Sequence, residues 1–326
     1  MLTAKVYESV FPLAEVFTIS RGSRTEARVV TVEIESGGYR GWGECVPYPR
    51  YNETVEGVIA DIKTFLAANP EHRRKGLQEA MAPGAARFAL DAAFWDLEAK
   101  AQGKRVWELA GLSEPKPEIT AYTLGINEPE VMEQKARENA HRPLLKIKLG
   151  AGQEDLDRLR AVRRGAPDAK IIVDANEGWT VDFYKEIAPL LLELGVAMVE
   201  QPLPAGEDDA LLGIERPLPV CADESVHDRR SLPKLVGKYD MINIKLDKTG
   251  GLTEALLLKE AAIKAGFGIM TGCMVGSSLS MAPATLIAQG AAFTDLDGPL
   301  LLAEDRPSPL TFDDKGVHPP TAELWG

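Results

Sequence analysis

The sequence predicts an α/β fold, a modified TIM (β/α)-barrel with an N-terminal α+β capping domain. Eight short apolar runs support the barrel, because parallel strands that are buried on both faces are continuously apolar. Successive runs end 22 to 26 residues apart, which is about the length of a strand, a helix and two turns. The runs end at these residues: Thr123, Lys148, Asp174, Glu200, Asp223, Lys245, Thr271 and Asp295.

The repeating pattern places the barrel domain at residues 116–298. We expect its strands at residues 119–124, 144–149, 171–174, 196–200, 218–223, 241–246, 267–271 and 292–297. In a closed parallel barrel the carboxyl ends of all eight strands meet on one face, where the active sites of such barrels lie. Residues 299–326 are rich in proline, so we expect an extended C-terminal segment that packs back on the capping domain.

The capping domain, residues 1–115, lacks the repeating pattern. Apolar and polar residues alternate over 5–10 and 27–35, as in half-buried strands, and Ser36-Gly37-Gly38 predicts a hairpin turn before a strand at 39–45. Helices are expected from about residue 52 to 68 and from Pro83 onward. The second of these is rich in alanine, which favours close packing against another element. How far the expected first loop, residues 19–25, closes over a substrate stays open.

Composition excludes several classes of function. The 326 residues carry a net charge of −12, whereas a nucleic-acid partner requires a basic surface. No apolar run approaches the ~20 residues of a membrane helix. The three cysteines are far apart and the first residues lack an apolar signal segment, so we expect a cytoplasmic protein that binds a small molecule. A homo-oligomer stays open.

Three consecutive strand ends predict a metal site. Asp174, Glu200 and Asp223 end the third, fourth and fifth expected strands of the barrel. Three carboxylates suit a hard divalent cation such as Mg²⁺, and the absence of histidine or cysteine beside them argues against zinc. Acidic residues are common at solvated strand ends, but three neighbouring ones flanked by lysines favour one Mg²⁺ per subunit.

Lysines are expected on both sides of this metal site. Lys146 and Lys148 lie two residues apart on one strand and therefore face the barrel interior together, where each should lower the pKa of the other. Lys245 ends the sixth expected strand, on the opposite side. Two amines that flank a metal-bound carboxylate can remove the proton on its α-carbon and return one from the other face.

Several motifs carry a family resemblance that extends over the whole chain. Lys146-x-Lys148 is joined by VDAN at 173–176, VEQP at 199–202, ADES at 222–225 and NIK at 243–245. Residues 19–24 (ISRGSR), 43–51 (GECVPYPRY) and 245–252 (KLDKTGGL) add to them. Together they resemble the muconate-lactonising subgroup of the enolase superfamily, and within it the dipeptide epimerases that act on L-Ala-D/L-Glu in murein peptide recycling.

The resemblance implies roles for individual residues. Asp174, Glu200 and Asp223 would bind Mg²⁺, Lys148 and Lys245 would be the acid/base pair, and Lys146 would support them. The resemblance further implies these substrate-binding residues: Arg24 for the side-chain carboxylate, Asp295 and Asp297 for the free amino group, and Thr123, Cys273 and Met274 in the pocket wall. Glu224 follows a metal ligand, but strand alternation predicts that it points outward.

Four other functions stay open. The first is a dipeptide epimerase of different side-chain specificity, because residues 275–278 vary among relatives and lie near the substrate. A cycloisomerase or o-succinylbenzoate synthase would share the first proton transfer, but its substrate has no ammonium group for Asp295 and Asp297. A Schiff-base lyase would use a barrel lysine as nucleophile. A barrel without catalysis would serve as a binding or structural module.

Overall fold

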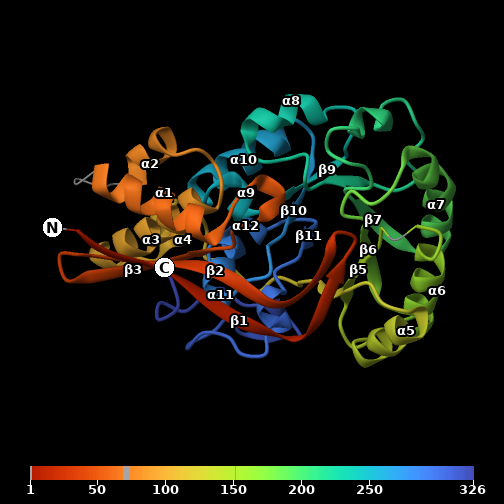
Figure 1. Ribbon diagram of the computed structural model, residues 1–326, viewed down its shortest axis with the longest axis horizontal. Coiled ribbons are helices and arrows are strands. Elements are labelled where there is room, and N and C mark those ends of the chain that lie inside the picture. The colour runs from red at the N-terminus through yellow and green to blue at the C-terminus, as the bar shows by residue number, and fades with distance from the viewer. Residues whose placement is uncertain (1, 69–73, 151) are drawn as a thin grey trace.

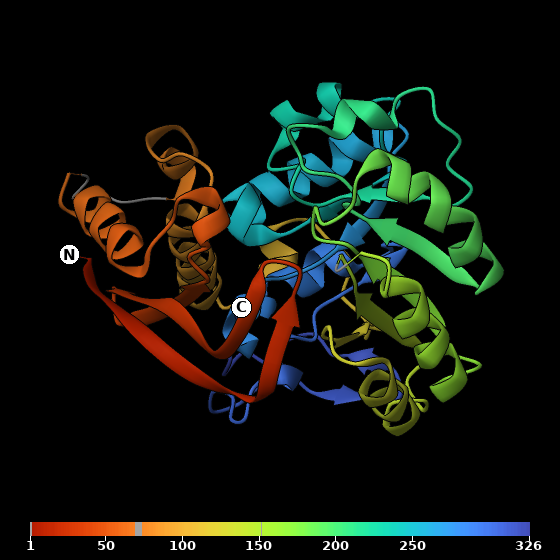
Figure 2. The same cartoon turned by 45° about the vertical axis from the view of Figure 1, so that its right-hand side comes forward.

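The capping region begins with a three-stranded antiparallel sheet (Figure 1). The computed structural model describes residues 2–68, 74–150 and 152–326. Strand β1 (Thr3–Ile19) pairs with β2 (Gly22–Ser36), and β2 pairs with β3 (Tyr39–Cys45). The β1–β2 pairing continues to Ile19 and Gly22, so the expected loop at 19–25 is the tip of a long hairpin. Figure 2 shows this tip over the barrel.

Helix α3 packs closely on this sheet. The helices of the capping region are α1 (Val55–Ala68), α2 (Arg74–Ala80), α3 (Ala85–Gln102) and α4 (Val106–Leu109). A Cβ atom added at Gly43 would lie 2.0 Å from the carbonyl oxygen of Ala89, and one at Gly41 would lie 2.1 Å from that of Ala93. Glycines on the strand and alanines on the helix therefore permit the close packing that the sequence predicts.

Eight parallel strands form the barrel, in the order β11-β10-β9-β8-β7-β6-β5-β4. They are β4 (Tyr122–Leu124), β5 (Leu144–Lys148), β6 (Lys170–Asp174), β7 (Val196–Glu200), β8 (Val220–Ala222), β9 (Met241–Ile244), β10 (Gly268–Thr271) and β11 (Phe293–Thr294). A parallel bridge between Thr120 and Thr294 joins the first strand to the last, and Ala121 N donates to Thr294 O at 2.8 Å. The predicted barrel with its capping domain is confirmed.

Helices cover the outside of the barrel (Figure 1). The helices of the barrel region are α5 (Pro129–Glu138), α6 (Asp155–Gly165), α7 (Val181–Glu193), α8 (Leu232–Leu235), α9 (Leu246–Thr249), α10 (Leu252–Lys264), α11 (Ser278–Met281) and α12 (Ala284–Ala288), of which α9 and α11 contact the capping region. Between β7 and β8 stands only a short 3-10 helix, η2 (Asp208–Leu211). The strand–helix repeat therefore lacks an α-helix between β7 and β8, the two strands that lead to Glu200 and Asp223. None of the helices in the described part of the chain is long and apolar enough to cross a membrane.

The C-terminal segment contacts both parts of the molecule. It contains a short hairpin of β12 (Phe312–Asp313) and β13 (Gly316–Val317). Arg306 Nη2 lies 2.6 Å from Glu44 Oε2 in the capping sheet, and Trp325 Nε1 donates to Ala92 O of α3 at 3.0 Å. Val317 N donates to Glu118 O, just before the first barrel strand, at 2.9 Å. The domain boundaries at 115 and 298 stay a prediction.

Candidate active site

The acidic cluster predicted at the strand ends forms at the carboxyl end of the barrel. Asp174 ends β6, Glu200 ends β7, and Asp223 follows the last residue of β8. All three are buried, and each offers one carboxylate oxygen, with the three oxygens within 4.8 Å of one another. Three negative charges at this spacing repel one another unless cations lie between them. The donor set is all oxygen, which fits a hard divalent cation such as Mg²⁺.

Lys146 lies among these carboxylates. Its Nζ is 2.7 Å from Glu200 Oε2, 2.7 Å from Asp295 Oδ2 and 3.2 Å from Asp174 Oδ2. Burial lowers the pKa of Lys146, but the three carboxylates outweigh it and raise the pKa well above its usual value. The expectation that the lysine pair lowers the pKa is therefore wrong for Lys146, because Asp295, Glu200 and Asp174 raise its pKa.

The two predicted acid/base lysines flank the acidic cluster from opposite sides. Lys148 on β5 has its Nζ 2.6 Å from Asp174 Oδ2, and Lys245, which follows β9, has its Nζ 2.7 Å from Asp223 Oδ2. Strands β6, β7 and β8 separate β5 from β9 in the sheet. Burial lowers the pKa of Lys245, but Asp223 and Glu200 reverse this effect and raise the pKa well above its usual value. Two amines thus face one space from two directions.

A narrow cavity that opens to solvent lies between this barrel end and the hairpin tip. Six predicted residues line it: Arg24, Lys148, Asp223, Lys245, Cys273 and Met274. Burial raises the pKa of the Cys273 thiol well above its usual value, which fits a wall residue and not a nucleophile. The cavity therefore combines the two lysines, a metal-type carboxylate and an arginine from the capping region.

Thr123, Asp295 and Asp297 form a separate buried group beside Lys146. Thr123 N donates to Asp297 Oδ2 at 2.6 Å, and Thr123 Oγ1 donates to Asp295 Oδ1 at 3.5 Å. Burial, together with Asp295, raises the pKa of Asp297 to about 7. These three residues are not among the described residues that line the cavity. Their proposed contact with a substrate amino group stays a prediction.

Arg24 extends from β2 toward the cavity as an exposed side chain. Its guanidinium carbon lies 4.9 Å from the centre of the Tyr48 ring, within the range of a cation–π contact. The ring restricts the side chain and leaves the planar guanidinium able to bind a carboxylate. Its role in recognising a substrate side chain stays a prediction.

The structure corrects the expectation for Glu224 and adds Arg21. Glu224 does not point outward, because β8 ends at Ala222 and strand alternation no longer applies two residues later. It lines the cavity, and its Oε1 lies 2.7 Å from Arg21 Nη1 at the hairpin tip. Burial, with Asp223 and Asp174 nearby, raises the pKa of Glu224 to about 7. Arg21 stands inside the ISRGSR motif, but no periodic pattern distinguishes it from Arg24.

The hairpin tip makes further polar contacts with the barrel and with Tyr48 of the capping region. Ser20 Oγ donates to Asn176 O at 3.0 Å, and Arg21 Nη1 donates to the same oxygen at 2.9 Å. Arg21 Nη2 donates to Tyr48 OH at 3.0 Å. These contacts hold the tip over the two lysines.

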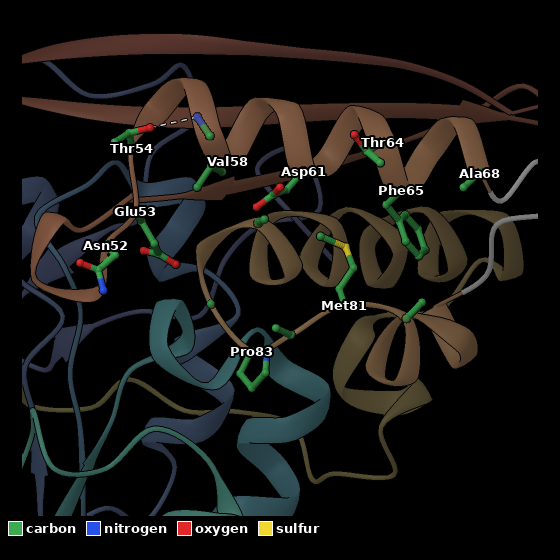
Figure 3. A pocket seen from close by; sticks show the side chains of 15 residues that line it. Asn52, Glu53, Thr54, Val58, Asp61, Thr64, Phe65, Ala68, Met81 and Pro83 are labelled. Carbon is green, nitrogen blue, oxygen red and sulfur yellow. Dashed lines mark hydrogen bonds between the residues drawn. The ribbon is translucent and has the colours of Figure 1, made fainter.

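A second hollow lies in the capping region, between α1 and the segment that leads into α3 (Figure 3). Glu53 and Asp61 are among the residues that line it, and none of its described lining residues is basic. Both oxygens of Glu53 are already engaged, one by Ala85 N at 2.8 Å and the other by Tyr48 N at 3.0 Å. Glu53 thus connects capping segments, and the reactive groups remain at the barrel end.

Comparison with known families agrees with this geometry. Residues 1–111 match the family described as mandelate racemase/muconate lactonizing enzyme, N-terminal domain, and residues 131–323 match the family described as enolase C-terminal domain-like. The chain belongs to the enolase superfamily. Membership of this superfamily, which the motifs predict, is confirmed. Its racemases and epimerases provide the most similar relatives described below.

Two curated relatives cover nearly the whole chain. The chain is 46% identical to an L-Ala-D/L-Glu epimerase from Escherichia coli K12 over 98% of this chain and 100% of that protein. It is 44% identical to an N-acetyl-D-glutamate racemase from a Pseudoalteromonas species over 91% of this chain and 95% of that protein. The two relatives act on glutamate derivatives that differ at the amino group, so this superfamily member resembles enzymes for both.

Two solved structures share the fold of this chain, and each of them holds a cation and a dipeptide. An enolase family member from Agrobacterium tumefaciens, with bound sodium and L-Ala-L-Glu, is 53% identical with a TM-score of 0.97 over the full length of both chains. A dipeptide epimerase from Enterococcus faecalis V583, with Mg and L-Leu-L-Tyr, is 31% identical with a TM-score of 0.88 over 97% of this chain and 96% of that chain. The three carboxylates of the acidic cluster in this chain fit a cation such as Mg²⁺.

Proposed function

We propose that this protein is a Mg²⁺-dependent dipeptide epimerase, an isomerase that inverts the α-carbon of the C-terminal residue of L-Ala-L/D-Glu. The position of Lys148 and Lys245 on opposite sides of one acidic cluster is the observation that carries the proposal. A carbon held between two amines can lose a proton to one and receive a proton from the other. The product then has the opposite configuration.

The roles within the site follow from charge and position. Asp174, Glu200 and Asp223 would hold Mg²⁺, which stabilises negative charge on the substrate carboxylate as the α-proton leaves. Lys148 and Lys245 would exchange the roles of acid and base between the two directions of the reaction. Lys146 offsets the charge of the carboxylates around it. The hairpin tip covers the reacting groups and limits their contact with water.

The two ends of the dipeptide would be bound by different parts of the protein. Arg24 would pair with the glutamate side chain, since a guanidinium and a carboxylate can form two parallel hydrogen bonds. Asp295 and Asp297, with Thr123 beside them, would bind the free amino group, and Cys273 and Met274 would form the pocket wall. The role in murein peptide recycling and the cytoplasmic location stay predictions.

Racemisation of an N-acylated glutamate is a second candidate function. Asp295 already pairs with Lys146, and burial favours the protonated form of Asp297 near neutral pH. A protonated carboxyl can donate a hydrogen bond to an acyl oxygen, where an ionised pair would bind an ammonium group. The similarity to an N-acetyl-D-glutamate racemase supports the same alternative.

An exchange assay distinguishes the two candidates. The Mg²⁺-loaded enzyme is incubated in deuterated water with L-Ala-L-Glu, N-acetyl-L-glutamate and an N-succinyl amino acid, and α-deuterium and configuration are measured. We expect deuterium and inversion with the dipeptide, and much slower exchange with the acylated compounds. Faster turnover of N-acetylglutamate would favour the second candidate, and no exchange in any substrate would overturn both.

A further inference from the structure

Gln201 adopts an uncommon backbone conformation directly after Glu200. Its φ angle is +35°, in the left-handed region that a residue with a side chain rarely occupies, and the residue is fully buried. Such conformations persist where the surrounding structure holds them firmly, and they are frequent at functional sites. The contacts of Gln201 therefore indicate which function requires this strained backbone conformation.

The side-chain amide of Gln201 joins the ends of two neighbouring strands. Its Oε1 accepts hydrogen bonds from the backbone N–H of Asp223 at 2.9 Å and of Ser225 at 3.2 Å. Because backbone N–H groups only donate, they determine which side of the amide is the oxygen. Nε2 lies within hydrogen-bonding distance of three oxygen atoms, at 2.8 to 2.9 Å: Leu203 O, Ser225 Oγ and Tyr239 OH.

Asp223 differs from the other two carboxylates of the cluster in its backbone support. Asp174 and Glu200 are paired with each other in the sheet, so hydrogen bonds between strands fix their positions. The pairing of β7 with β8 ends at Glu200 and Cys221, and that of β8 with β9 ends at Ala222 and Ile242. Asp223 lies beyond both, and its N–H donates to Gln201 instead of to a strand.

We propose that Gln201 is a positioning residue that sets the distance between the metal ligands Glu200 and Asp223. This inference deepens the proposed function and rests on its metal site. The hydrogen bond from Asp223 N–H to Gln201 Oε1 adds one link between the two chain segments just beyond the last paired residues of β7 and β8. The strained backbone directs the side chain across the gap, and a buried polar network keeps it there.

That network continues away from the metal site. Ser225 Oγ donates to Asp208 Oδ2 at 2.6 Å, and Tyr239 OH donates to the same oxygen at 3.0 Å. Lys238 Nζ, 2.7 Å from Asp208 Oδ1, balances the charge of this carboxylate. The far side of the Gln201 amide is thus fixed by groups that do not touch the metal ligands. Tyr239 therefore offers a control in the same network.

The test is Mg²⁺ binding measured by calorimetry on the full-length protein. Gln201→Met keeps the approximate volume and removes every side-chain hydrogen bond. Loss of a group that orients a metal ligand typically costs about 10- to 100-fold in metal affinity, which is the loss we expect. At saturating Mg²⁺ the turnover of Gln201→Met should recover most of the wild-type value, since the lysines are unchanged. Tyr239→Phe should lower thermal stability but leave Mg²⁺ affinity within about threefold of wild type, because the Oε1 contacts remain.

Wild-type Mg²⁺ affinity in Gln201→Met would overturn the inference, as would an equal loss of affinity in Tyr239→Phe. Should Gln201→Met fail to fold, Gln201→Glu carries the test, because its oxygens still accept from the N–H groups of Asp223 and Ser225. We expect this variant to bind Mg²⁺ within about tenfold of wild type, and a larger loss would contradict the inference. Absence of Mg²⁺ binding in the wild type would instead overturn the proposed function itself.

Discussion

The barrel end and the hairpin tip both contribute to the cavity, but they hold their charged groups in different ways. Lys148 and Asp174 have side-chain exposures of 10% and 0%, and adjacent strands fix their backbones. Arg21 at the hairpin tip is 27% exposed, and side-chain contacts hold it in place. The proton-transfer groups thus lie at the ends of barrel strands, whereas Arg24 and Arg21, which would bind the substrate side chain and cover the site, lie on a separate hairpin. Substitutions in the two regions should affect different kinetic constants.

The largest expected effect comes from the lysines of the barrel end. Lys148→Met and Lys245→Met should each lower kcat for epimerisation about 10²- to 10⁴-fold, the usual contribution of a general acid or base. Each variant should still exchange the α-proton of one configuration of the substrate with solvent, because one base remains. Mass spectrometry of both diastereomers in deuterated water measures this. Retained epimerisation in both variants would exclude the two-base mechanism.

On the hairpin, Arg24→Met should change specificity more than catalysis. We expect kcat/KM for L-Ala-L-Glu to fall about 10- to 100-fold, since a charge-assisted pair of hydrogen bonds is lost. L-Ala-L-Gln should be nearly unaffected, so the ratio of the two kcat/KM values is the measurement. Arg28→Gln is the matched control on the same strand, because Arg28 pairs with Glu8 at the surface. An unchanged ratio in Arg24→Met would remove Arg24 from substrate recognition.

A smaller effect is expected where the hairpin tip meets the barrel. Glu224→Gln and Arg21→Gln should each raise KM about 3- to 10-fold with less change in kcat, because a partly exposed ion pair contributes modestly. The double variant should be no worse than Arg21→Gln alone, because that substitution already removes the contact with Glu224. Steady-state kinetics of all four proteins tests this. Additive effects would mean that the two residues act independently.

The smallest expected effect lies at the junction of the two regions. Asp247 on α9 accepts a hydrogen bond from Val46 N of the capping region at 2.7 Å, and burial raises its pKa to about 8. Between pH 4 and 8 the unfolded chain loses this proton and the folded protein keeps it, so stability falls as pH rises. Asp247→Asn should therefore raise Tm by about 1–4 °C at pH 8 relative to wild type, and by less at pH 5.

Scanning calorimetry at several pH values measures this difference. Asp157→Asn makes the same chemical change on the exposed surface of α6 and is the control for the substitution itself. A difference between Asp247→Asn and wild type that stays constant from pH 5 to pH 8 would contradict the prediction.

The barrel was predictable because its strands are buried on both faces and end in polar or charged residues at regular intervals. For the same reason Lys148, Asp174, Glu200 and Lys245 could be placed at the site from their positions alone. Prediction failed where the chain leaves a strand: Glu224 turns inward two residues after β8 ends. Arg21 escaped notice because its barrel partners, Asn176 and Glu224, lie 155 and 203 residues away in the sequence, and Gln201 because its role depends on an uncommon φ angle.

The contacts that complete this molecule join segments from the two ends of the chain. The first barrel strand meets the last through Thr120 and Thr294, and Arg306 reaches Glu44 across 262 positions. During synthesis, the outer edge of β4 therefore stays unpaired until β11 has been made. Closing such distant contacts is slow, and an open sheet edge promotes aggregation. The yield of folded protein should thus depend on whether the open strand edge is kept from pairing with other chains before the barrel closes.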